Sequence, residues 1–130
     1  MEKAVIYTDG ASRGNPGPAA IGAIIKDGSA GPVVTISRRI GRATNNQAEY
    51  RAVIAALELA LEHSARQVLL YSDSELIVKQ LKGCYRIKNE DLKPLHQQVG
   101  RLIARLDSFH IYHVSRNRNR EADRLANAAL

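Results

Sequence analysis

The apolar residues of the chain follow two patterns, one typical of strands and one typical of helices. At 3–8 and 67–72, apolar residues form short runs with little alternation, which is typical of strands buried on both faces. At 91–106, leucine and valine recur at spacings of three and four residues, which predicts a helix with one buried side. The chain is therefore expected to form strands joined by helices.

Turn and capping residues place the remaining elements. Asp27-Gly28 lies between two apolar segments and predicts a hairpin. Thr44 and Gln47 fit a capping box, which starts a long helix that ends near His63. The other expected elements are a turn at 10–18, strands at 19–26, 32–40 and 109–114, a helix at 74–81 and a last helix capped by Asn119.

The order of these elements determines the class of fold. The strands at 67–72 and 109–114 each return through helical connections, so their pairings should be parallel, with right-handed crossovers. The early hairpin adds antiparallel pairing. Because no linker, low-complexity run or internal repeat interrupts the 130 residues, we predict one α/β domain over 1–130 with a mixed sheet.

Composition agrees with a globular protein in a reducing compartment. Apolar residues make up 45% of the chain and charged residues 25%, which argues against disorder. The single cysteine, Cys84, has no partner for an intramolecular disulfide, and no apolar run approaches the roughly 20 residues that cross a bilayer. We expect a cytoplasmic monomer without a membrane segment.

The charge of the chain favours a polyanionic partner. Nineteen basic residues against thirteen acidic ones give a net charge of +6, and thirteen of the nineteen are arginine. The planar guanidinium suits phosphate oxygens, so nucleic acid is favoured over the alternative of a solvated basic surface. With no Trp, one Phe and five Tyr, an extended stacking platform is not expected, so contacts should go to the nucleic-acid backbone.

Two strand ends carry the same sequence of residue types. The segments that end in Asp9 and Asp73 both read apolar run, Tyr, hydroxyl residue, Asp, small residue. Either aspartate alone is most simply a turn or cap residue. If the two strands are parallel neighbours, however, both carboxylates emerge at the carboxyl edge of the sheet, where open α/β sheets hold their sites.

Two further acidic residues occupy helix starts. Glu49 is placed in the first turn of the long helix on its apolar side, and Asp123 lies four residues into the last helix. Stabilisation of a helix N-terminus is the alternative for each. Four converging carboxylates without a nearby Cys or His favour Mg²⁺ or Mn²⁺ over zinc. The residues 10–17 lack the Gly-Lys-Ser/Thr ending of a P-loop.

Four short motifs follow one another along nearly the whole chain, from residue 4 to 129. They read Thr8-Asp9-Gly10-Ala11-Ser12-x-Gly14-Asn15-Pro16-Gly17, Thr44-Asn45-Asn46-x-Ala48-Glu49, Ser72-Asp73-Ser74 and Asn119-x-x-Ala122-Asp123-x-Leu125-Ala126. In this order they resemble the type 1 ribonuclease H family. The resemblance implies an RNase H-like fold, a five-stranded mixed sheet flanked by helices, and endonucleolytic hydrolysis of the RNA strand of RNA/DNA hybrids.

The resemblance also implies roles for individual residues. Asp9, Glu49, Asp73 and Asp123 match the catalytic, metal-binding carboxylates of the family, which hold two Mg²⁺ or Mn²⁺ ions per active site. Such a site activates water and leaves 5′-phosphate and 3′-hydroxyl ends. The positions that match substrate-binding residues are Gly10, Ala11, Ser12, Asn15, Thr44, Asn45 and Asn46.

Two stretches depart from the bacterial pattern of the family. Many bacterial members carry a mobile histidine before the last aspartate, and His113 has the matching separation from Asp123. Because 109–114 is expected to be a strand, we favour Arg116, as in compact archaeal-type members, as the auxiliary catalytic residue. The basic protrusion is reduced to 83–90, so grip on the hybrid must come from elsewhere. The candidates are Arg38, Arg39, Arg42, Arg116, Arg118 and Arg120, and a solvated face is the alternative for them.

Three other functions stay open at the level of sequence. A relaxed nuclease that also cleaves double-stranded RNA is suggested by the missing protrusion. A DNA strand-transfer enzyme of the wider superfamily would need a further domain for recognising DNA ends. A non-catalytic nucleic-acid-binding module is the alternative of a different class, and the four intact acidic positions argue against it.

Overall fold

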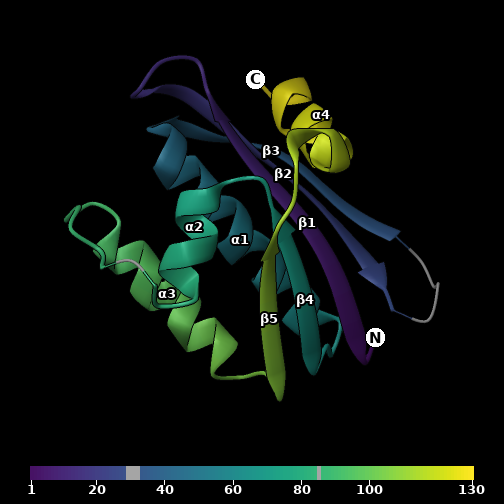
Figure 1. Ribbon diagram of the computed structural model, residues 1–130. Helices are drawn as coiled ribbons and strands as arrows, with labels where there is room; N and C mark the ends of the chain where they lie inside the picture. The colour runs from purple at the N-terminus through teal and green to yellow at the C-terminus, as the bar shows by residue number, and fades with distance from the viewer. Residues whose placement is uncertain (29–32, 85) are drawn as a thin grey trace.

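The computed structural model describes residues 1–28, 33–84 and 86–130 and contains one five-stranded sheet with the order β3-β2-β1-β4-β5 (Figure 1). β1 pairs antiparallel with β2 and parallel with β4. β2 pairs antiparallel with β3, and β4 pairs parallel with β5. The strands are β1 Lys3–Ser12, β2 Gly17–Asp27, β3 Val33–Ala43, β4 Gln67–Ser72 and β5 Ser108–His113. The predicted mixed sheet and both parallel pairings are confirmed.

Helices cover the two faces of the sheet unequally. α1, α2 and α3 lie on one side, and α4 lies on the other, over β2 and β1 (Figure 1). The helices are α1 Asn45–Glu62, α2 Glu75–Leu81, α3 Lys93–Ile103 and α4 Arg120–Ala128, with a 3₁₀ turn, η1, at Arg116–Asn119. Among the described residues, no helix combines the length and hydrophobicity that crossing a membrane requires.

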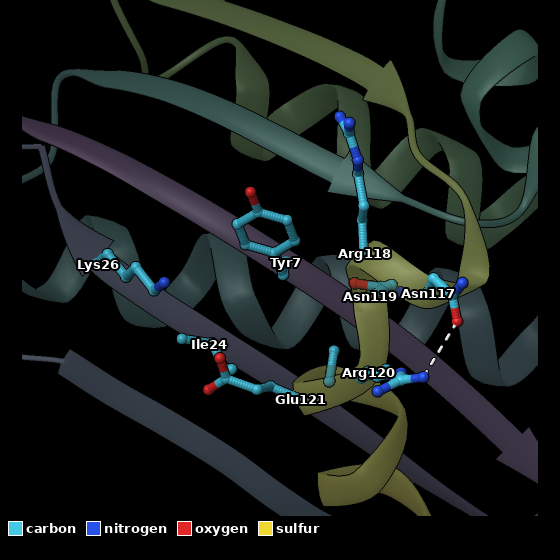
Figure 2. A pocket seen from close by; sticks show the side chains of 9 residues that line it. Tyr7, Ile24, Lys26, Asn117, Arg118, Asn119, Arg120 and Glu121 are labelled. Atoms are coloured by element: carbon cyan, nitrogen blue, oxygen red, sulfur yellow. Dashed lines mark hydrogen bonds between the residues drawn. The ribbon is translucent and has the colours of Figure 1, made fainter.

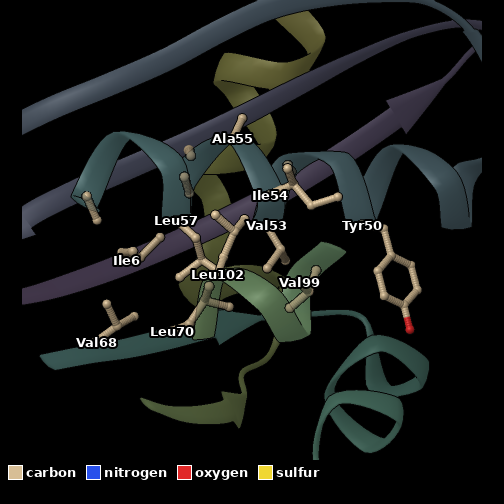
Figure 3. Close-up of a cluster of buried hydrophobic side chains, with 14 of the residues drawn as sticks. Ile6, Tyr50, Val53, Ile54, Ala55, Leu57, Val68, Leu70, Val99 and Leu102 are labelled. Atoms are coloured by element: carbon tan, nitrogen blue, oxygen red, sulfur yellow. The ribbon is translucent and has the colours of Figure 1, made fainter. Parts of the chain in front are cut away.

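The main core lies between the sheet and α1 (Figure 3). Ile6 on β1 and Leu70 on β4 are fully buried against Val53 and Leu57 of α1, and Val99 brings α3 onto the same cluster. These side chains follow the predicted periods, two along the strands and three to four along the helices. The core therefore fixes α1 over the centre of the sheet.

The opposite face accepts α4 because a glycine stands beneath it. A Cβ on Gly22 of β2 would lie 2.3 Å from the carbonyl oxygen of Ala122 and 2.5 Å from the amide nitrogen of Ala126. Both alanines are buried. This close backbone approach sets the start of α4 beside β1, the strand that pairs with β2 at Asp9–Gly22.

Several element boundaries differ from the sequence prediction. β1 and β2 extend into the segment predicted as a turn, because β1 pairs with β2 as far as Ser12 and β2 pairs with β3 from Gly17 onward. α3 is shorter than 91–106, since Pro94 stands in its first turn and the residues after Ile103 form tighter i→i−3 bonds. Gly28 donates its amide to Lys3, whereas the rest of the predicted hairpin turn, 29–32, lies outside the described residues.

Candidate active site

The ends of the two central strands bring two aspartates to one edge of the sheet. β1 and β4 are parallel neighbours, and Thr8 pairs with Ser72. Asp9 and Asp73, the residues that follow this pair, therefore emerge side by side at the carboxyl edge. Their predicted convergence is confirmed by the strand register.

A glycine lets the third carboxylate approach this edge. A Cβ on Gly10 would lie 2.3 Å from the carbonyl carbon of Ala48 and 2.5 Å from the amide nitrogen of Glu49. Only a residue without a side chain allows the start of α1 to touch β1 here. The helix begins at Asn45, so Glu49 lies beyond its first turn; our placement of it within that turn was wrong by about one residue. Stabilisation of the helix N-terminus therefore explains Glu49 less well.

Three carboxylates gather where these elements meet. One oxygen from each of Asp9, Glu49 and Asp73 lies within 4.8 Å of the others. Asp9 and Glu49 are only 5% and 8% exposed, and Oε2 of Glu49 is buried without a hydrogen-bond partner. A buried oxygen without a donor is costly unless a cation or water satisfies it. The donor set consists of oxygen only, which fits a hard divalent cation.

The electrostatics of the cluster agree with such a cation. Burial raises the pKa of Asp9 to about 7; a hydrogen bond with Glu49 lowers it, while Asp123 and Asp73 add to the increase. The pKa of Glu49 also lies well above its usual value, through burial and then the negative charge of Asp9. Like charges forced together in a buried place favour any ion that neutralises them.

Asp123 stands next to this group of three. It lies in the first turn of α4, as expected, and is half-buried. Its Oδ1 accepts a 3.0 Å hydrogen bond from Nδ2 of Asn127, which also donates to the Asp123 carbonyl. Hydrogen bonding and negative charge from Asp123 contribute to the raised pKa of Asp9, so the two carboxyls face each other.

Asn119 has a different place from the one predicted. It precedes α4 without a capping hydrogen bond from its side chain. Instead its Nδ2 donates to the carbonyl of Thr8 at 2.8 Å and to Oδ2 of Asp73 at 3.3 Å. The side chain is 1% exposed. Asn119 thus ties the start of α4 to both acidic strand ends. Its place in the fourth motif was the sequence signal for such a role, but we interpreted the residue as a helix cap.

The residues matched to substrate contacts surround the same edge. The capping box is confirmed, since Gln47 donates its amide to Thr44 and accepts from the Thr44 amide in return. Asn45 donates its amide to Oδ1 of Asn15 at 3.0 Å, which ties the β1–β2 connection to α1. Gly10 lies at the close contact with α1, and Ala11 is half-buried on β1. Ser12 donates its hydroxyl to the Ala43 carbonyl at 2.8 Å, and Asn46 is exposed on α1.

The two candidates for the auxiliary residue lie on either side of a strand end. His113 is the last residue of β5, as expected, and Arg116 begins η1. Both side chains are exposed. No hydrogen bond or ion pair within the described residues joins either one to the carboxylates. Arg116 starts the turn that ends in Asn119, the residue bonded to Asp73.

Comparisons with known proteins agree with this geometry. A family profile described as "Reverse transcriptase-like" matches residues 7–129. The Ribonuclease HI of Halobacterium salinarum is 48% identical over 95% of this chain. The chain spans 62% of the length of that relative and 35% of the matching mycobacterial proteins.

Two solved ribonuclease H structures match over nearly their full length. The RNase H1 of Halobacterium salinarum superimposes with a TM-score of 0.94 at 46% identity, covering 98% of this chain and 96% of that one. LC11-RNase H1, isolated from compost and solved in complex with an RNA/DNA hybrid, gives 0.89 at 39% identity, covering 97% and 95%. Between α2 and α3 the described residues form no additional helix, as in the compact type. The chain therefore belongs to the reverse transcriptase-like family and is a homologue of the type 1 ribonucleases H.

Proposed function

We propose that the protein is an endonuclease that hydrolyses the RNA strand of RNA/DNA hybrids. The observation that carries this proposal is the convergence of three carboxylates, one of them with a buried unpaired oxygen, at the carboxyl edge of the sheet. The similarity to the Halobacterium enzyme and to a relative solved with a hybrid supports the substrate class. Such a cluster serves metal-assisted phosphodiester hydrolysis better than simple binding.

Asp9, Glu49, Asp73 and Asp123 would hold the metal, with Asp9 at the centre because the other carboxyls surround it. Two Mg²⁺ or Mn²⁺ ions would lower the pKa of the attacking water and offset charge on the leaving 3′-oxygen, giving 5′-phosphate and 3′-hydroxyl ends. The chain itself supplies the position of the ligands. Asn119 fixes Asp73, and Gly10 permits the approach of Glu49.

Other residues would orient the substrate and help the departing product. Backbone and side-chain donors near Ser12, Asn15 and the start of α1 would contact the hybrid, so cleavage should depend little on base sequence. Selection of RNA requires a contact to the 2′-hydroxyl of the cleaved strand. Arg116 is permanently charged, so it would stabilise phosphate charge and transfer no proton. The proposed enzyme would act as a monomer in the cytosol, and the exposed free thiol of Cys84 fits the reducing conditions there.

End-labelled substrates test the proposal directly. A hybrid, double-stranded RNA, single-stranded RNA and duplex DNA are each incubated with Mg²⁺ and with Mn²⁺. We expect cleavage of the RNA in the hybrid, abolished in Asp73→Asn, and unaffected in Asp91→Asn, a matched exposed aspartate before α3. Equal cleavage of double-stranded RNA would favour the relaxed nuclease. Binding of the hybrid without cleavage by either ion would refute the enzymatic assignment.

A further inference from the structure

The face of the sheet that carries α4 is covered over one part only. α4 packs mainly on β2, with further contacts to β1 and β3. Because side chains alternate along a strand, the residues that follow Ile6, Leu70 and Ile111 point away from the α1 core. On β5 this residue is Tyr112, which is 41% exposed. The β4–β5 side of this face is therefore open to a ligand.

Three tyrosines form a ridge across this face. Tyr7, Tyr71 and Tyr112 are paired in register on β1, β4 and β5. Their ring centroids lie 4.9 and 5.5 Å apart, with interplanar angles of 17° and 29°. Nζ of Lys26 lies 5.7 Å from the ring centroid of Tyr7, and Nζ of Lys82 lies 5.7 Å from that of Tyr112. We call these three tyrosines the tyrosine ridge.

The ridge offers polar edges and no free ring faces. Its rings stack on one another and carry a lysine at each end, so a base has no ring face on which to stack. Within the described residues the tyrosine hydroxyl that forms a hydrogen bond is that of Tyr50, which donates to Gln80, and the three hydroxyl groups of the ridge have no such partner. A row of hydroxyl donors between two ammonium groups is suited to phosphate and ribose oxygens.

A cationic pocket continues the ridge at the Tyr7 end (Figure 2). It has a volume of about 350 Å³ and is lined by Tyr7, Lys26 and the segment from Asn117 to Ala122. Lys26, Arg118 and Arg120 line it together with one acidic residue, Glu121, and Arg120 donates to Oδ1 of Asn117 at 3.4 Å (Figure 2). None of the three cations forms an ion pair in the part of the chain that the structure describes. We call it the Arg118 pocket.

The Arg118 pocket adjoins the carboxylate cluster. Asn119 forms part of its wall and, through Nδ2, reaches Oδ2 of Asp73 at 3.3 Å. A strand that leaves the carboxylates over Asn119 meets Arg118 first and Tyr7 next, and Lys26 lies one step farther from the catalytic edge, where β2 pairs with Val5 (Figure 2). The pocket and the ridge thus form one path from the catalytic edge down the face of the sheet.

We propose that the Arg118 pocket and the tyrosine ridge bind a single-stranded continuation of the RNA strand whose hybrid portion is cleaved. This inference rests on the proposed function. A duplex lying on the edge of the sheet is too stiff to bend onto the adjoining face, whereas a single strand follows it. The unpaired cations complement the phosphates, and the volume of the pocket, at the low end for ligand sites, suits one nucleotide at a time.

Equilibrium binding of four fluorescent hybrids tests the inference in EDTA, where no metal supports cleavage. One hybrid is blunt, one has an RNA overhang at the 5′ end, one has it at the 3′ end, and one has a DNA overhang. We expect an RNA overhang at one end alone to tighten binding by roughly threefold or more, with a steeper salt dependence. Two added phosphate contacts steepen the log–log slope by roughly 1.4.

The double variant Lys26→Ala/Lys82→Ala, which removes the ammonium group at each end of the ridge, should bind the overhanging and the blunt hybrid equally, with the blunt affinity as in the wild type. Arg101→Ala/Arg105→Ala removes the same charge at the end of α3, on the other side of the sheet, and should keep the gain from the overhang. Tyr112→Phe keeps the stacked ring and removes its hydroxyl, so it should reduce the gain in part.

The inference is overturned if the RNA overhang adds no affinity, or if a 5′, a 3′ and a DNA overhang all add the same affinity. It is also overturned if the double variant weakens binding of the blunt hybrid as much as binding of the overhanging hybrid. Cleavage of the blunt hybrid with Mg²⁺ is measured in parallel. If the blunt hybrid is cleaved but the overhang has no effect on binding, this inference alone is rejected. If the blunt hybrid is not cleaved, the proposed function is rejected.

Discussion

Replacing Asp9 by asparagine should stabilise the metal-free protein at neutral pH. The pKa of Asp9 rises from 3.8 to about 7 on folding, chiefly through burial. In the unfolded chain this carboxyl ionises near pH 4, whereas in the folded protein it stays protonated until about pH 7. Folding stability is therefore lost as the pH rises through this window, and it stays low above it.

The size of the effect follows from the shift. About three pKa units at 1.36 kcal/mol each correspond to at most about 4 kcal/mol lost between pH 4 and pH 7. An asparagine side chain at this position would keep the shape of the aspartate and carry no charge, so Asp9→Asn should recover much of this stability at pH 8 and almost none at pH 4. For a chain of this size the gain amounts to roughly 3 °C in Tm for each kcal/mol.

Urea and thermal denaturation in EDTA from pH 4 to pH 8 measure this difference, with Asp91→Asn as the control that should show no pH-dependent gain. Adding Mg²⁺ at pH 8 should stabilise the wild type, because the ion offsets the negative charge of Asp9. It should have little effect on Asp9→Asn, in which this charge is absent. Wild-type stability that stays level between pH 4 and pH 7, or an equal gain from Asp9→Asn at both ends, would refute the reasoning.

Three further substitutions address other parts of the site. Asn119→Ala should cost about 2 kcal/mol of stability in urea, because it removes a buried hydrogen-bonded side chain, and should weaken Mg²⁺ binding measured by calorimetry through a loosened Asp73. Gly10→Ala should lower Tm strongly and abolish cleavage, since its Cβ meets the backbone of α1; a Tm within error of the wild type would contradict this. Arg116→Ala should reduce kcat with little change in hybrid affinity, while His113→Ala should leave kcat and its pH profile nearly unchanged; the reverse result would favour His113.

Periodicity and local motifs were sufficient to predict most of the architecture. The unbroken apolar runs identified the two central strands, and the helical connections implied their parallel pairing, which in turn placed Asp9 and Asp73 at one edge. The capping box at Thr44 located the start of α1 because it depends only on residues three apart. Local chemistry of this kind is readable from the chain itself.

The tertiary structure decided what depends on contacts between distant segments. The burial of Glu49, and hence its unpaired oxygen, follows from the passage of α1 over Gly10, which no local pattern reveals. Asn119 exchanges the expected capping role for bonds to Thr8 and Asp73, because η1 carries it under the edge of the sheet. Side-chain partners across such separations depend on packing, which the order of residues alone does not specify.

The aromatic residues show the same division. A count of five tyrosines argued against an extended stacking platform, and in the described part of the chain three of them, Tyr7, Tyr71 and Tyr112, stack on one another. Their alignment across β1, β4 and β5 depends on the strand register, which the sequence does not state. Composition thus argued against contacts to nucleic acid through base stacking. The tyrosine ridge itself follows from the register of the sheet, because residues far apart in the chain become neighbours only when strands pair.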